Sequence, residues 1–127
     1  MHAPGKVAVI GAGGFVGSRV VEIFHLRSPF VLVPVVRNIV SLARLSRFDL
    51  EWKLADATNG EQLSKALAGC ECVVHSVVGD PRVIEASAAA LVPAAARAGV
   101  RRVVHLSSAS VHGQNPSPGS NEDSPLG

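Results

Sequence analysis

Residues 6–17 read KVAVIGAGGFVG, a short β-branched run followed directly by a glycine-rich loop. Gly11, Gly14 and Gly17 are spaced three residues apart. In a strand–loop–helix unit, one such glycine permits the tight turn, another lets backbone approach a pyrophosphate, and the third lets the helix lie close to the strand. Free N–H groups at the helix N-terminus then favour an anion. The stretch therefore predicts a dinucleotide-binding loop; the alternative is a glycine-rich turn without a ligand.

Short apolar runs alternate with helical patterns along the rest of the chain, which is typical of a parallel α/β sheet. We expect strands at residues 6–10, 30–36, 51–54, 72–78 and 102–106. Pro34 inside the second run favours an edge or a bulge, because proline donates no ladder hydrogen bond. The predicted fold class is α/β, a Rossmann-like doubly wound parallel sheet with strand order 3-2-1-4-5.

Helices are expected at residues 14–26 and 59–67 and from Pro81 to Ala98, with a short helix or loop at 38–48. Asp80 before Pro81 is a typical helix start, and Gly99 a typical stop. Pro93 should kink the last helix. On the first helix we expect one apolar face, made of Val16, Val20, Ile23 and Phe24.

The composition changes near residue 113. Residues 1–112 are predicted to form an NAD(P)-binding domain. Residues 113–127 are rich in proline, glycine and serine and are expected to be a loop or disordered tail.

Charge and hydropathy exclude several classes of partner. The 127-residue chain has a formal net charge of +2, too small for a nucleic-acid footprint. No apolar run approaches the roughly 18 residues that a membrane span needs. Cys70 and Cys72 cannot form a disulfide framework, which favours a reducing compartment. We therefore expect a cytoplasmic protein with a small-molecule substrate and without nucleic-acid or membrane partners.

Arg37 and Asn38 follow the second predicted strand, about 20 residues after the last glycine of the loop. An acidic residue here would bind the ribose hydroxyls of NAD, whereas a guanidinium pairs with a 2′-phosphate. Arg37 therefore favours NADP over NAD as the cofactor. An ordinary solvated arginine is the alternative.

With the glycine loop, Arg37, Asp56 and Ser107–Gly113 together, the chain resembles the N-terminal portion of the extended short-chain dehydrogenase/reductase family, which includes NAD(P)-dependent epimerases and dehydratases. LADAT at 54–58, VVHSVV at 73–78 and SSASVHG at 107–113 are similar to its third-strand, fourth-strand and serine segments. The resemblance implies oxidoreduction, epimerisation or dehydration of a nucleotide-sugar or a related carbonyl or hydroxyl compound. It also implies a possible homodimer through the helix at 81–98.

The resemblance assigns roles to individual residues. Asp56 would contact the adenine amine, and Val77 and Val78 would run beneath the nicotinamide ribose. Ser108 would be the catalytic serine, which hydrogen-bonds the reacting substrate oxygen. The complete set expected to bind cofactor is Gly11, Gly13, Gly14, Phe15, Val16, Gly17, Arg37, Asn38, Asp56, Ala57, Val77 and Val78.

One departure from the family concerns its general acid. The family uses a tyrosine and a lysine after the serine, and this chain has no tyrosine. We expect a fragment, truncated before the catalytic tyrosine helix and inactive alone. The alternative is a dinucleotide-binding sensor or regulator that lacks catalysis.

Two histidines fall on predicted neighbouring strands, His75 on the fourth and His105 on the fifth. Imidazoles within strands are more often satisfied core groups than ligands. No metal site is predicted, because further ligands at suitable spacing are lacking.

Overall fold

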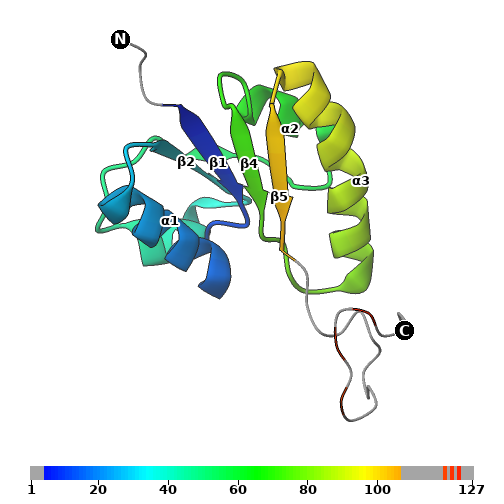
Figure 1. Cartoon of the computed structure of the whole chain (residues 1–127), viewed down its shortest axis with the longest axis horizontal. Helices are drawn as coiled ribbons and strands as arrows, with labels where there is room; N and C mark the ends of the chain where they lie inside the picture. The colour runs from blue at the N-terminus through cyan, green and yellow to red at the C-terminus, as the bar shows by residue number, and fades with distance from the viewer. Residues whose placement is uncertain (1–4, 107–118, 120, 122, 124–127) are drawn as a thin grey trace.

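The computed structural model describes residues 5–106 together with Gly119, Asn121 and Asp123. Five parallel strands form one sheet in the order β3-β2-β1-β4-β5 (Figure 1). Their bounds are β1 Lys6–Ile10, β2 Val31–Val36, β3 Lys53–Leu54, β4 Cys72–His75 and β5 Arg102–His105. The predicted Rossmann-like α/β fold and its strand order are confirmed.

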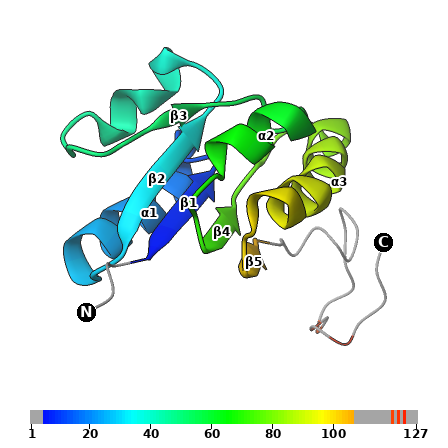
Figure 2. The same ribbon diagram turned by 90° about the horizontal axis from the view of Figure 1, so that it is seen from above.

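Helices cover both faces of the sheet (Figure 2). On one face lie α1 (Phe15–Arg27) and the 3₁₀ helix η1 (Ile39–Leu45), and on the other α2 (Gly60–Ala66) and α3 (Pro81–Ala98). Successive strand residues point to opposite faces, so Val7 and Val9 join the core under α1, while Ala8 and Ile10 join the core under α2 and α3. Because β1, β2 and β4 are largely buried on both faces, these strands are mostly continuous apolar runs rather than alternating ones.

The buried face of α1 differs from the predicted one. Gly17, Ser18 and Val21 face the sheet, whereas Val16 and Ile23 are 47% and 45% exposed. The predicted apolar face was therefore wrong for Val16 and Ile23. The small residues let the helix approach β1 closely, and the Ser18 hydroxyl donates to the Phe15 carbonyl oxygen at 3.1 Å, which makes its burial inexpensive.

Pro34 lies within β2, a strand paired on both sides, so the expected edge or bulge was wrong. The Val35 carbonyl accepts from Gly11 on the β1 side, and the Val36 carbonyl accepts from Ala55 on the β3 side. By this alternation the Pro34 nitrogen faces the β3 side. Since β3 pairs only with Val35 and Val36, no ladder bond is lost at Pro34.

Several element ends differ from the predictions. β4 stops at His75 rather than at residue 78, because the chain leaves the sheet after the Ser76 amide donates to the Ile10 carbonyl. β3 and β2 begin at Lys53 and Val31, later than expected. The predicted boundary at residue 112 and the tail fall almost entirely outside the described residues.

The ends of α3 are as predicted. The Asp80 carboxylate accepts from the Arg82 amide at 2.8 Å, Pro81 opens the helix, and Gly99 ends it with a φ of 78°. The helix is continuous through Pro93. A kink at Pro93 stays a prediction.

Candidate functional site: a cleft at the carboxyl ends of the strands

A cleft of about 490 Å³ lies where β1, β2 and β4 end, at the point where the strand order reverses. Ligands bind at this position in open α/β sheets. The predicted cofactor residues that line it are Gly11, Gly13, Gly14, Arg37, Asp56, Ala57, Val77 and Val78. Residues from the glycine loop after β1 and from the segments after β2, β3 and β4 thus meet in one cavity.

Two glycines of the loop are required by the fold. Gly11 has a φ of +80°, and a β-carbon there would overlap the carbonyl oxygen of Ser76. A β-carbon at Gly17 would overlap the carbonyl oxygen of Gly11. These positions provide the turn and the close packing of helix on strand that the glycine spacing predicts.

Gly13 and Gly14 face different neighbours. A β-carbon at Gly13 would lie 2.5 Å from the Ser41 carbonyl oxygen, so Gly13 lets η1 pack on the loop. Among residues 5–106, the one atom within 4 Å of a β-carbon at Gly14, chain neighbours aside, is the Gly11 carbonyl oxygen, at an ordinary 3.4 Å. The Gly14 φ of −78° suits any residue. The protein itself therefore leaves room at Gly14, on the wall of the cleft.

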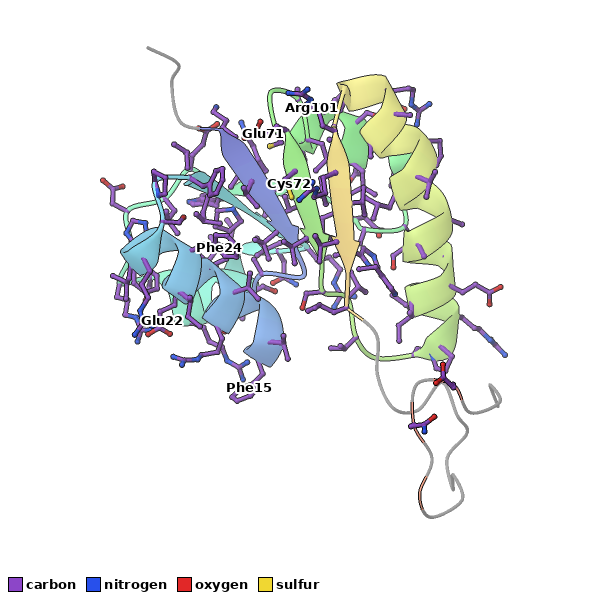
Figure 3. All side chains as sticks on the ribbon, viewed as in Figure 1. Phe15, Glu22, Phe24, Glu71, Cys72 and Arg101 are labelled. Carbon is purple, nitrogen blue, oxygen red and sulfur yellow. The ribbon has the colours of Figure 1, made fainter. Side chains whose placement is uncertain are left out.

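The first turn of α1 supplies the amides beside Gly14. The Gly14 amide donates to the Gly11 carbonyl and the Ser18 amide to the Gly14 carbonyl. The amides of Phe15 and Val16, in the first helical turn, have no acceptor within the helix and carry the positive end of its dipole. The Phe15 side chain is 73% exposed and lies 5.9 Å from the Arg44 guanidinium, outside the cleft lining (Figure 3).

Arg37 follows β2 directly, is exposed, and lines the cleft. Asn38 does not line it. Its side-chain oxygen caps η1, accepting from the Ser41 amide at 3.0 Å and from the Ser41 hydroxyl at 2.9 Å. Asn38 therefore acts on the cleft through Ser41, which lines it and was missed from the sequence.

Asp56 and Thr58 form the wall after β3. Asp56 Oδ1 accepts from the Thr58 hydroxyl at 2.7 Å and from the Thr58 amide at 2.8 Å. The hydrogen bonds from the Thr58 hydroxyl and amide, together with the Arg37 charge, lower the pKa of Asp56. Slight burial of the carboxylate opposes this shift without cancelling it. Asp56 is thus a carboxylate held in one orientation within the electrostatic reach of Arg37.

The wall after β4 consists of Ser76 and apolar side chains. Val77 packs against the core under α2 and α3, whereas Val78 is 72% exposed, and Val83 from α3 joins them. Ser108, the predicted catalytic serine, lies outside the described residues.

Residues 5–106 with 119, 121 and 123 contain no cluster of three or more His, Cys, Asp or Glu that could hold a metal ion. Within the same ranges, no helix has the length and apolar character to cross a membrane.

Comparison with known proteins gives a family match. A family model described as NAD(P)H-binding matches residues 11–126. The fatty acid hydroxylase uhd1 of Mycosarcoma maydis is 33% identical over 86 residues, which cover 65% of this chain and 29% of that protein.

Solved structures are similar in fold. Triphenylmethane reductase from Citrobacter sp. is 26% identical with a TM-score of 0.72, over 89% of this chain and 40% of that one. The NADPH-dependent quinone oxidoreductase from Escherichia coli, solved with NADPH, is 25% identical with a TM-score of 0.71, over 78% and 35%. UDP-N-acetylglucosamine 4-epimerase from Bacillus cereus, at 24% identity and a TM-score of 0.77 over 96% and 42%, shows the shared fold. The chain spans less than half the length of each of these proteins.

Proposed function

This chain belongs to the NAD(P)H-binding family, and we propose that it is the cofactor-binding portion of an NAD(P)-dependent oxidoreductase or epimerase of the short-chain dehydrogenase/reductase type. The predicted resemblance to the N-terminal portion of that family is confirmed, and the cofactor is NAD or NADP. The observation that carries the proposal is the space at Gly14, where a β-carbon would meet only the Gly11 carbonyl oxygen among the described residues outside its chain neighbours.

The pyrophosphate would lie on the first turn of α1. Gly14 keeps that approach clear, and the amides of Phe15 and Val16 donate to the phosphate oxygens. The first turn of α1 contains no acidic residue that would repel them. Gly11 and Gly17 hold the loop in place and act indirectly.

NADP is the proposed preference. The Arg37 guanidinium lies in the cleft at the end of β2, where it can pair with a 2′-phosphate. Asp56 would face the adenine amine, with its carboxylate oriented by Thr58. A second structure of triphenylmethane reductase, 27% identical to this chain, contains NADP(H) and supports this preference.

The chemistry would be hydride transfer, which the nicotinamide supplies when the cofactor is bound. Val77 and Val78 would pack beneath the nicotinamide ribose, and Ser108 would donate a hydrogen bond to the substrate oxygen. We propose a nucleotide-sugar or a related carbonyl or hydroxyl compound as the substrate. The chain has no tyrosine to act as the family's general acid, so we expect it to bind cofactor without turnover on its own.

A second candidate is a dinucleotide sensor without catalysis. Arg37 and the lack of tyrosine in residues 1–127 are compatible with it. An oxidoreductase and a sensor would both bind the dinucleotide. Only the oxidoreductase requires a general acid beside Ser108, so the DNA downstream of codon 127 discriminates between them. A Tyr-x-x-x-Lys motif there supports the enzyme, and a stop codon supports the sensor.

Calorimetric titration tests cofactor binding directly. We expect saturable 1:1 binding of NADPH, weaker binding of NADH, and binding of 2′,5′-ADP, which carries the adenosine end alone. Gly14→Val should remove NADPH binding, while Gly60→Ala, a change at a glycine outside the cleft lining and without a positive φ, should not. Unchanged NADPH affinity in Gly14→Val would contradict the proposal.

A further inference from the structure

A chain of polar side chains crosses the face of the sheet beneath α3. His75 Nε2 lies 3.0 Å from the Ser87 hydroxyl on α3, and His75 Nδ1 lies 2.8 Å from His105 Nδ1 on β5. His75 and His105 are register partners on neighbouring strands, and their rings stack with centroids 4.9 Å apart. β4, β5 and α3 lie together at one edge of the sheet (Figures 1 and 2).

Hydrogen-bond accounting assigns the protons in this chain. Ser87 has one hydroxyl proton, and its oxygen also lies 2.9 Å from the Ile84 carbonyl, which can only accept. If Ser87 donates to Ile84, His75 must donate from Nε2 and accept at Nδ1, and His105 must donate from Nδ1. This arrangement makes every contact a hydrogen bond, whereas the reverse tautomers leave the Ser87–Ile84 contact without a proton.

The two rings differ in their capacity for a further proton. His105 is exposed and can take a proton at Nε2 while its Nδ1 continues to donate to His75. His75 is 1% exposed and has both nitrogens engaged. A single extra proton keeps the bond, because His105 can move its own proton to the exposed Nε2 and accept from His75 at Nδ1. When both rings are protonated, two N–H groups face each other across 2.8 Å, and the bond between the strands is lost.

Within the described part of the chain, His75 meets no compensating charge. β1 presents Ile10 to it in register, α3 presents Ser87, and β5 presents His105. The charged side chains on the two helices of this face are exposed: Arg82, Glu85 and Arg97 on α3, and Glu61 and Lys65 on α2. Burial first, and His105 second, lower the pKa of His75, which favours its neutral form.

We propose that Ser87, His75 and His105 form an acid-sensitive clamp that ties α3 to the carboxyl ends of β4 and β5. The clamp is closed while His75 is neutral, whichever charge His105 carries. It opens when His75 takes a proton while His105 is also protonated. Ser76 and Val83, which follow His75 and precede Ser87, line the cofactor cleft, so an open clamp loosens one wall of that cleft.

The sign of the pH effect follows from linkage. The pKa of His75 in the folded chain lies below its usual value near 6.5, so the unfolded chain binds more protons at acid pH. Stability is therefore full above about pH 7 and falls as the pH drops through that usual value.

Nitrogen-15 spectra of the imidazoles in the unmodified chain test the assignment without any variant. At pH 7.5 we expect His75 to be protonated at Nε2 alone and His105 to be protonated at Nδ1, with a coupling across the Nδ1–Nδ1 hydrogen bond. His75 protonated at Nδ1, or titrating at its usual pKa, would overturn the proposal.

A variant separates the clamp from other titrating groups. His75→Phe leaves Ser87 bonded to Ile84 and His105 open to water, so no buried polar group loses its partner. The melting temperature of the unmodified chain should fall by several degrees more between pH 7.5 and 5 than that of His75→Phe. The control variant His25→Gln, which replaces an exposed histidine, should show the same fall in melting temperature as the unmodified chain. An equal fall in His75→Phe overturns the proposal, and so does the loss of the fall in His25→Gln.

Discussion

The carbonyl oxygen of Gly11 occupies the space that a β-carbon of residue 17 would need, so α1 can lie against its loop only because Gly17 has no side chain. A β-carbon at Gly14, three residues earlier, would lie at an ordinary 3.4 Å from the same oxygen. The fold therefore requires a glycine at position 17, whereas the glycine at position 14 leaves space for a ligand.

This contrast predicts opposite effects for two alanine substitutions. Gly14→Ala should change the free energy of unfolding by about 0.5 kcal/mol or less, because its β-carbon fits and its φ suits alanine. It should weaken NADPH binding at least tenfold. Gly17→Ala should cost about 1–3 kcal/mol of stability through overpacking. Urea unfolding and calorimetric titration measure both quantities, and a Gly14→Ala chain that binds NADPH normally would refute the assignment.

Arg37→Asp should reverse the cofactor preference. Charge repulsion and the loss of a guanidinium weaken NADPH binding, while a carboxylate at this position can accept the ribose hydroxyls of NADH. The ratio of the two dissociation constants measures the change. Arg101→Asp is a matched control, because Arg101 lies exposed before β5 at the opposite end of the sheet (Figure 3). A ratio that stays constant in Arg37→Asp argues against a 2′-phosphate site.

Asp56→Asn should increase the preference for NADPH several-fold. The asparagine oxygen can still accept from Thr58, but the negative charge near Arg37 is removed. The relevant measurement is again the ratio of NADPH to NADH affinities, with melting temperature as the check on folding. A lower ratio would place the phosphate away from Asp56.

Thr58→Val should raise the pKa of Asp56, because the hydroxyl bond is the first cause of its lowering. The carbon-13 titration of the Asp56 carboxyl group measures this shift. Because the folded-state pKa is lowered, the stabilisation exists above the unfolded value and is lost as the pH falls through the folded value. Thr58→Val should reduce that acid dependence, and an unchanged titration midpoint would reject the role of the hydroxyl.

Asn38→Ala should cost about 1 kcal/mol, because it removes the cap of η1. Asn38→Ser retains a capping oxygen and should restore most of that loss. Since Asn38 holds Ser41 on the cleft wall, Asn38→Ala should also weaken NADPH binding, by less than Arg37→Asp does. Equal stability of the alanine and serine variants would count against the cap.

The sheet could be predicted because each of its strands is a short apolar run between turn residues. The ends of the strands could not be predicted in the same way. The sequence SVV at 76–78 is about as apolar as β4 itself, and β4 ends only because the chain leaves β1 there. The buried face of α1 was misassigned because Gly17 and Ser18 carry no hydrophobic signal, although their small size lets the helix approach the sheet.

Spacing alone predicted the structural roles of Gly11 and Gly17 and the place of Arg37 on the cleft wall, whereas the cofactor role of Arg37 stays a prediction. Ser41 and Thr58 were missed, because their places in the cleft depend on how η1 and the loop after β3 fold back. Local signals existed: an asparagine three residues before Ser41, and an aspartate two residues before Thr58, are typical capping and turn patterns. Self-association through residues 81–98 and the role of Ser108 stay predictions.

Amide chemical shifts during titration with NADPH test the central claim most directly. The account predicts saturable changes that are largest at the amides of Gly13 to Val16, with a second group at Arg37 and Ser41, and little change at Arg101. Saturable binding that leaves the amides of residues 11–17 unchanged would contradict it.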